Sequence, residues 1–325
     1  MDPQVQERLM MFGGFIPGAV SMLLLMAAWY LHAFKASRVD HDEHHADDEY
    51  EDDGESTRRS IGPRWVLPIM LALGFAGAVY AVDEQQKLWP DSNADRFLHA
   101  MVIIGLVGVI EGLVRLPVLV GFVVRFFGFT VAFWMLAEAY VTIFGDHSIF
   151  VGSAIFAGLV SSLLVAGADR SSEDTPAWVD AGSWLIIAGA SMPIFFQNNF
   201  SLGAMYPAGV IAVLVSTGVT GLVFKDLRFA RGGNTVLVGM LMALMVGSII
   251  QTGAVNLPAV MLLGVAPMVL LVPLKSASGV RRLLARLVIL AAVLGASGGL
   301  MIQSSSADAG DGYDDYESEM DYGQE

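Results

Sequence analysis

The sequence predicts an all-α fold, a polytopic bundle of about ten transmembrane helices with both termini outside the cytoplasm. Hydrophobic residues make up 55% of the 325-residue chain and charged residues only 15%, whereas a typical soluble domain is about 25% charged. Several apolar runs reach about 18 residues, which is long enough to cross a bilayer as a helix. Lys and Arg lie almost entirely in alternate gaps between these runs, which is typical of cytoplasmic loops.

Ten apolar stretches are long enough to predict one membrane span each. At 1.5 Å per residue such helices measure about 25–35 Å, compared with a hydrocarbon core of about 30 Å. The third and fourth are the hardest to separate, because only a short stretch containing Pro117 divides them and Arg125 interrupts the run. The predicted spans are 12–34, 65–82, 97–113, 122–144, 149–166, 178–197, 202–224, 235–255, 257–274 and 283–303.

The basic residues support both the number of spans and their orientation. The amino tail and the gaps after even-numbered spans contain only Arg8, Lys87 and Arg96. The gaps after odd-numbered spans contain the other fifteen: Lys35, Arg38, Arg58, Arg59, Arg64, Arg115, Arg125, Arg170, Lys225, Arg228, Arg231, Lys275, Arg281, Arg282 and Arg286. Because basic loops stay cytoplasmic, we expect a plasma (inner) membrane protein with both termini on the outer side.

Composition divides the chain into four regions. We expect an N-terminal tail and first helix (1–34), a cytoplasmic acidic and His-rich disordered linker (35–64), a nine-helix bundle packing with the first helix (65–303) and a disordered acidic tail (304–325). The two acidic segments hold 18 of the 32 carboxylates, so the net charge of −14 belongs mainly to them. This acidity argues against nucleic-acid binding, while the tail could bind a protein partner.

The residue types also limit the chemistry. The chain has no cysteine, which excludes disulfides, thiolate metal sites and cysteine nucleophiles. No nucleotide-binding loop, nucleophile motif or heme-ligating histidine pair is evident, and the loops are too short for a soluble catalytic domain. We therefore expect no cofactor and no enzymatic activity.

One candidate metal site lies in the linker. His41, His44 and His45 fall within five residues and alternate with carboxylates. Imidazole and carboxylate together suit zinc, nickel or cobalt. The alternative is a solvated acidic linker without bound metal, and no matching ligand cluster lies within the predicted helices.

Glu138 is the leading intramembrane candidate. It lies six residues from the outer end of the fourth span, about 9 Å along the helix. A carboxylate at that depth must pair, take up a proton or face water. One interpretation is a proton or cation site, and the other is a polar contact between helices with His99, Gln251 or Tyr140.

A second group of charges lies at the cytoplasmic end of the third and fourth spans. Glu111 and Arg115 are four residues apart, which permits an ion pair on a helix, and Arg125 enters the next span at similar depth. These residues could form a gate or an anionic-headgroup site. The alternative, which the sequence favours, is a set of interfacial charges whose long side chains reach toward water.

The outer hairpin between the sixth and seventh spans is a third candidate. Pro193 removes a backbone donor, and Gln197, Asn198 and Asn199 follow it. These amides, with Gln251 in a similar turn, could line a polar vestibule or a broken-helix site. The simpler interpretation, which we favour, is that they cap helix ends at the water boundary.

These features favour a transporter of a small solute or ion in the lipid bilayer, with Glu138 as its coupling or binding carboxylate. The alternative is a membrane scaffold or a subunit of a membrane complex that docks partners through its acidic tails. The first hypothesis rests on the number of helices, the sparse intramembrane polar groups and the absence of extramembrane catalytic mass.

Overall fold

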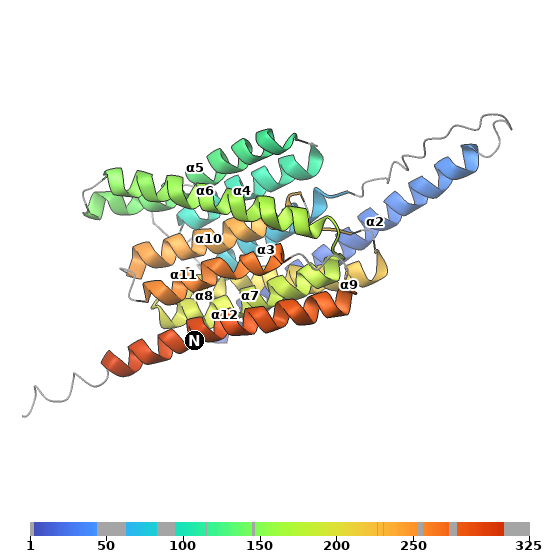
Figure 1. The fold of residues 1–325 in the computed structure, drawn as a ribbon. Helices are drawn as coiled ribbons and strands as arrows, with labels where there is room; N and C mark the ends of the chain where they lie inside the picture. Colours follow the sequence, from blue (N-terminus) through green and yellow to red (C-terminus); the bar gives the residue numbers. More distant parts are fainter. Residues whose placement is uncertain are drawn as a thin grey trace, which may run out of the picture.

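A computed structural model describes residues 3–43, 63–82, 95–114, 116–144, 147–225, 227–229, 231–252, 256–272 and 278–308. These residues contain helices and no β-strand (Figure 1). In chain order the elements are α1 (Pro3–Met10), the π-helical η1 (Met11–Phe15), α2 (Ile16–Glu43), α3 (Val66–Val82), α4 (Asp95–Leu113), α5 (Val118–Phe144), α6 (His147–Ser172), α7 (Ala177–Gln197), α8 (Ser201–Met205), α9 (Pro207–Val223), α10 (Gly233–Thr252), α11 (Leu257–Val265), the 3-10 helix η2 (Ala266–Leu271) and α12 (Gly279–Asp308).

Apolar helices lie at all ten predicted positions. Eight of them are long and apolar enough to cross a membrane, and two shorter ones, Val66–Val82 and Leu257–Leu271, occupy the second and ninth positions. The predicted all-α, multi-pass helical fold is confirmed, and the chain is an integral membrane protein. The side on which each terminus lies stays a prediction.

Several helix ends differ from the prediction. α2 continues to Glu43 and α12 to Asp308, so the first parts of the expected linker 35–64 and of the expected tail 304–325 are helical. The rest of both segments lies outside the described residues, apart from 63 and 64. α5 begins at Val118, directly after Pro117, because proline fixes its own φ and disfavours helix in the residue before it.

Proline changes the hydrogen-bond pattern within two of the predicted spans. In the seventh, Tyr206 alone separates α8 from α9 and itself has helical φ and ψ of −61° and −34°, because Pro207 has no N–H to continue the hydrogen-bond series. The ninth changes from α11 to the tighter η2 at Ala266, where Pro267 cannot donate to the carbonyl of Leu263.

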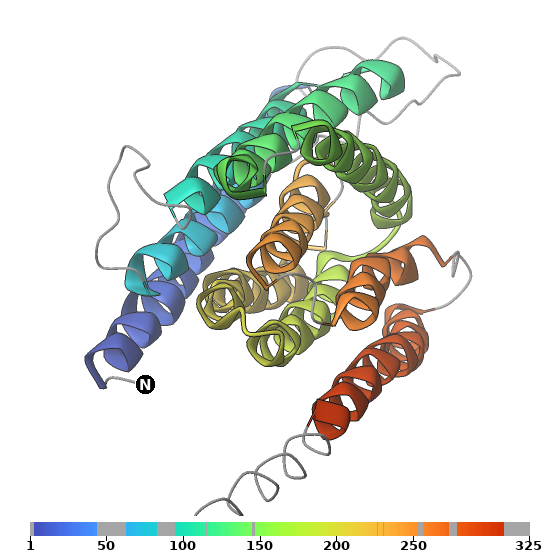
Figure 2. The ribbon, with the colours of Figure 1, turned by 90° about the vertical axis from the view of Figure 1, so that its left-hand side faces the viewer.

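α10 is the central helix of the bundle. In its most apolar stretch 83% of residues are buried, compared with 17% in the first span and in α12. It contacts α3, α4, α5, α6, α7, α8 and α11, and the end-on view in Figure 2 shows it surrounded by other helices while α12 stands at the edge. Residues that α10 carries therefore face the interior on nearly all sides.

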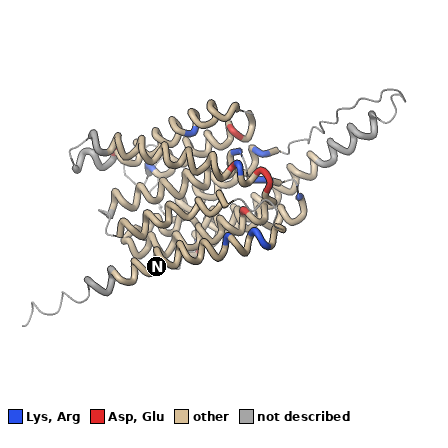
Figure 3. The backbone as a smooth tube through the Cα atoms, viewed as in Figure 1, with Lys and Arg blue, Asp and Glu red and all other residues tan. Residues whose placement is uncertain are grey.

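The charged residues gather at one end of this bundle (Figure 3). The carboxyl ends of α4 and α6 and the amino ends of α5, α7, α10 and α12 meet there, because neighbouring helices run antiparallel. We call this the charged end. It coincides with the basic gaps of the sequence, and it positions the site described next.

Candidate functional site

Arg125 forms the centre of a buried charged cluster at the charged end. Its Nε donates a hydrogen bond to Glu111 Oε1 on α4, and its Nη2 donates one to Asp169 Oδ2 on α6. The side chains of Arg125, Glu111 and Asp169 are only 11%, 4% and 11% exposed. The cluster thus joins three neighbouring helices through two carboxylates and one guanidinium.

The first turn of α10 supplies donors to the remaining carboxylate oxygens. The Thr235 hydroxyl donates to Glu111 Oε2. Asn234 Nδ2 and the backbone N–H of Arg231 each donate to Asp169 Oδ1, both at 3.1 Å. All four oxygens of the two carboxylates therefore accept a hydrogen bond, as buried charges require.

The turn before α10 depends on a glycine. Arg231 and Gly232 both have positive φ, at 62° and 110°. A Cβ on Gly232 would lie 2.4 Å from the carbonyl oxygen of Gly108 on α4, which is impossible without movement of the backbone. Gly232 therefore lets α10 approach α4 closely, and this approach brings Thr235 within reach of Glu111.

Asn234 extends the cluster toward α7. Its Oδ1 accepts a hydrogen bond from Trp184 Nε1 at 3.2 Å, and its Nδ2 lies 3.1 Å from the Ser172 hydroxyl as well as from Asp169. Asn234 is fully buried. The polar network consequently crosses α4, α5, α6, α7 and α10 near the charged end.

A pocket of about 820 Å³ opens onto the cluster. Its lining includes Glu111, Arg125 and Asp169, and it is partly open to its surroundings. Its other lining residues are the charged Arg170, Glu173 and Arg231, and the mainly apolar Val114, Leu116, Pro117, Val118, Leu119, Gly121, Phe122 and Ala166. The cluster is therefore accessible to a molecule of moderate size.

A second buried ion pair lies between α7 and α12. Arg286 Nη1 is 2.6 Å from Asp180 Oδ1, with side chains 2% and 0% exposed. Arg286 Nη2 donates to the Ser171 hydroxyl at 3.1 Å. Asp180 Oδ2 and Arg286 Nε have no hydrogen-bond partner within the described chain. Neither residue lines the pocket, so this pair attaches the peripheral α12 to the bundle.

The structure gives the predicted interfacial charges a different arrangement. Glu111 pairs with Arg125 rather than reaching toward water, and both are buried, so the expectation of side chains that extend to the interface is wrong for these two. Arg115 lies outside the described residues, and its pairing with Glu111 stays a prediction. Glu111 and Arg125 are buried because α6 and α10 contribute polar partners for this pair, and the local sequence does not reveal these partners.

Glu138 lies toward the opposite end of the bundle, on α5. Its carboxylate is 3.5 Å from Arg96 Nη1, and its side chain is 47% exposed. Arg96 also donates to the backbone carbonyl of Met135 at 3.2 Å. The expected contacts of Glu138 with His99, Gln251 or Tyr140 stay a prediction, and His99 makes an interaction of its own.

The outer amides separate into one buried residue and three exposed ones. Asn198 is fully buried, its Nδ2 is 2.5 Å from Ser248 Oγ, and its Oδ1 accepts from the backbone N–H of Asn256 at 3.2 Å. Gln197, Asn199 and Gln251 are exposed. Asn198 therefore ties α7 to α10 and to the start of α11, whereas the other three amides lie at the surface.

Most of the histidine-rich linker lies outside the described residues. His41 lies in the last turn of α2, but its side chain and all of His44 and His45 are outside the described residues. Within the part of the chain that the structure describes, no group of three His, Asp or Glu side chains could hold a metal ion. Metal binding by this linker stays a prediction.

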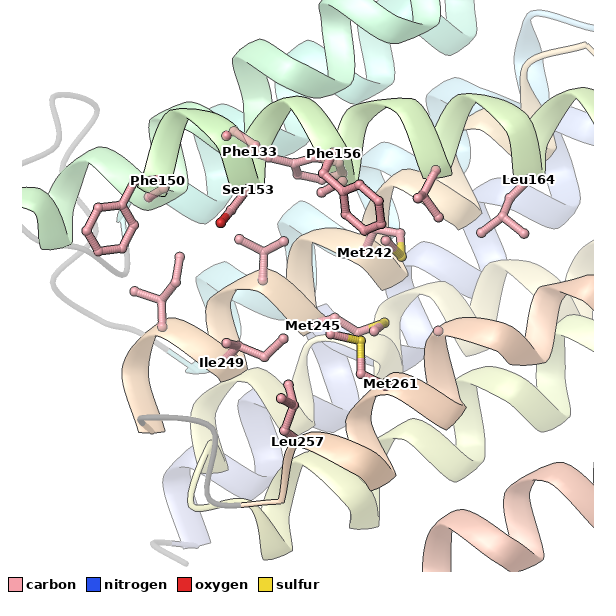
Figure 4. Close-up of a pocket in the computed structure, with 18 of the residues that line it drawn as sticks. Phe133, Phe150, Ser153, Phe156, Leu164, Met242, Met245, Ile249, Leu257 and Met261 are labelled. Carbon is pink, nitrogen blue, oxygen red and sulfur yellow. The ribbon is translucent and has the colours of Figure 1, made fainter. Parts of the chain in front are cut away.

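A second cavity, of about 830 Å³, is almost entirely apolar (Figure 4). Side chains of α6, such as Phe156, face Met242 and Met245 of α10 and Met261 of α11 across it, and Ser153 is its one polar lining residue. Phe156 and Met261 are exposed. This second cavity therefore opens toward the lipid, and lipid hydrocarbon can fill it.

Comparison of the chain with protein-family models, with characterised proteins and with solved structures finds no match. The class of protein is defined by the fold itself, a multi-pass helical membrane protein. The interpretation of its site consequently depends on the residues around Arg125.

Proposed function

We propose that the protein is a transporter of a small solute or ion, with the Glu111–Arg125–Asp169 cluster as the charged part of its binding site. The observation that carries the proposal is that these buried charges lie at an open pocket of about 820 Å³. Ionisable residues within membrane helices are costly, and they commonly mark substrate or ion pathways.

The apolar core beyond the cluster supports the same interpretation. Ile104 lies seven residues before Glu111 on α4, about 10 Å along the helix, and it is fully buried against α10. Phe129 on α5 and Leu241 on α10 are also buried in this part of the core. A pocket that is open at one end and blocked toward the other is what alternating access requires of one of its states.

The distribution of basic residues supports a pocket that opens to the cytoplasm. Arg170, Arg228, Arg231 and Arg281 all belong to gaps at the charged end, and such gaps remain cytoplasmic. The pocket then corresponds to an inward-open state in the plasma membrane, with both termini outside.

Reconstituted protein provides the test. Proteoliposomes adsorbed on a solid-supported membrane would be exposed to concentration jumps of protons, Na⁺, inorganic phosphate, acetate and glutamate. We expect a transient current with at least one of them, reduced about tenfold or more in Asp169→Asn because the carboxylate that holds Arg125 at the pocket is lost. Glu173→Gln, which changes a half-exposed pocket residue, is the matched control and should keep most of the current.

The other outcomes distinguish the alternatives. Absence of current with all five solutes, in protein that elutes as a single species and unfolds cooperatively, would favour a scaffold over a transporter. A current that Asp169→Asn leaves unchanged but Glu138→Gln abolishes would move the coupling carboxylate to the opposite end of the bundle.

A further inference from the structure

The hydrogen-bonding state of the pocket indicates the sign of its ligand. Glu111 and Asp169 use all four oxygens to accept bonds from Arg125, Thr235, Asn234 and the N–H of Arg231. Asp169 Oδ1 accepts two of these bonds and each of the other three oxygens accepts one. The two buried carboxylates are therefore engaged in holding Arg125 in place.

Donors, in contrast, are available. Arg125 uses Nε and Nη2 for the carboxylates, and its Nη1 makes no hydrogen bond to a described residue. Arg170 lines the pocket, is exposed and has no partner among the described residues. Among the described residues, the Arg231 side chain makes one long contact, with Glu173, at 3.6 Å between half-exposed side chains. Three guanidinium groups can thus donate into one cavity.

The rest of the pocket lining is mainly apolar. Val118 and Leu119, at the start of α5, are 89% and 74% exposed, and Leu116 and Phe122 also line the pocket. A ligand that fills the pocket therefore meets both guanidinium groups and apolar side chains.

From these observations we infer that the pocket binds a phosphate group, held by Arg125, Arg170 and Arg231. Guanidinium recognises phosphate through paired N–H donors and remains charged at any physiological pH. Two sources share this chemistry, the headgroup of a phospholipid and free phosphate. The apolar part of the lining favours the phospholipid, because acyl chains can lie along Val118 and Leu119.

The test compares three probes on delipidated full-length protein in detergent. Phosphatidic acid and a diacylglycerol with the same acyl chains differ only by the phosphate, and inorganic phosphate lacks the chains. Thermal unfolding as a function of probe concentration gives each affinity, because a ligand bound to the folded state raises Tm. Native mass spectrometry counts bound lipid. We expect one phosphatidic acid per chain, binding at least about tenfold more tightly than diacylglycerol.

Two substitutions locate the site. Arg170→Gln removes an exposed cation from the pocket, so it should weaken phosphatidic acid binding about tenfold and leave the Tm of the free protein unchanged. Arg281→Gln makes the same change at an exposed position on α12, at the same end but outside the pocket, and should leave binding unchanged. Equal affinity for phosphatidic acid and diacylglycerol, or equal loss in the two variants, would overturn the inference. Tighter binding of inorganic phosphate than of phosphatidic acid would assign the site to the free ion.

This inference rests on the proposed function only in taking the same pocket as the ligand site, and the two can fail separately. Phosphate binding without any transported solute would refute transport and keep the site. Transport of a solute by protein that binds neither phosphatidic acid nor phosphate would refute the phosphate site and keep the function.

Discussion

Arg125 and Arg286 are both buried in membrane helices at the charged end, yet their surroundings differ. Arg125 has two carboxylate partners, which accept further hydrogen bonds from Thr235 and Asn234 of α10, and a pocket beside it. Arg286 has one carboxylate partner among the described residues, Asp180, in an enclosed position where one atom of each side chain has no hydrogen-bond partner within the described chain. A buried ion pair can therefore serve attachment alone, and the adjoining cavity distinguishes a candidate binding site from such a contact.

The largest effect on stability should follow loss of Arg286. Arg286→Ala leaves the Asp180 carboxylate buried without its counter-charge, which costs about 3–5 kcal/mol in the free energy of unfolding. Unfolding in mixed detergent micelles measures it. Arg281→Ala, on the exposed face of the same helix, should change this free energy by less than about 0.5 kcal/mol. Equal effects of the two changes would mean that the pair does not hold α12.

A double replacement of Asp180 and Arg286 tests whether the buried unpaired charge causes this loss of stability. Asp180→Leu combined with Arg286→Met removes both charges and keeps the volume, so we expect it to recover most of the stability lost in Arg286→Ala. The same unfolding measurement applies. A double variant as unstable as the single one would indicate that the two charges support the fold beyond their mutual contact.

Removal of Arg125 should cost less stability than removal of Arg286. Arg125→Gln leaves two carboxylates uncompensated, but water from the pocket can hydrate them, and Thr235 and Asn234 still donate to them. The free energy of unfolding compares the two variants directly. If Arg125→Gln proves the more destabilising, the cluster is mainly a structural element.

Replacement of Asn234 should lower the free energy of unfolding by less than loss of Arg286 does and by more than loss of Glu138 does. Asn234→Leu deprives Asp169 Oδ1 of one donor and Trp184 Nε1 of its acceptor, and such unsatisfied buried groups cost about 1–3 kcal/mol. Thr217→Val, a fully buried change on α9 whose hydroxyl bonds only to its own helix, is the control. An Asn234→Leu variant no less stable than this control would contradict a connected network.

The smallest effect should come from the ion pair at the opposite end. Glu138 and Arg96 are partly exposed and 3.5 Å apart, and such pairs contribute less than about 1 kcal/mol. Glu138→Gln should therefore hardly change the unfolding free energy. A loss above about 2 kcal/mol would indicate that Glu138 is less accessible to solvent than its 47% exposure implies.

The fold was largely predictable because hydropathy along the chain determines which segments cross the bilayer. The change in hydrogen-bond pattern at Tyr206 was not predicted, although Pro207 was visible in the sequence. Glu111 and Arg125 were recognisable as charges at the ends of spans. Their partners were not, since Asp169 and Asn234 are 44 and 109 residues from Arg125 in the chain, and only packing of α4, α5, α6 and α10 brings them together.

Asp180 and Arg286 show what additional signal the sequence contained. Both lie inside predicted spans, at 178–197 and 283–303, where an ionisable residue calls for a partner of opposite charge. Arg286 also belongs to the run of basic residues before the tenth span, and this run is typical of a cytoplasmic loop. The need of Arg286 for a buried partner is therefore harder to recognise. Each of these two spans carries one charge a few residues from the same end of the bundle, and the two charges are opposite. This pattern predicts the contact between α7 and α12.

Transport through the proposed site requires that the Arg125 cluster be accessible from one side of the membrane through its pocket. Because the chain has no cysteine, Ala166→Cys in the pocket can be labelled with an impermeant maleimide in sealed vesicles of either orientation. Ser278→Cys, an exposed position at the charged end, and Ala243→Cys, in the closed core of α10, give the two references. We predict that Ala166→Cys reacts only from the side on which Ser278→Cys reacts. An Ala166→Cys variant as unreactive as Ala243→Cys would contradict the account.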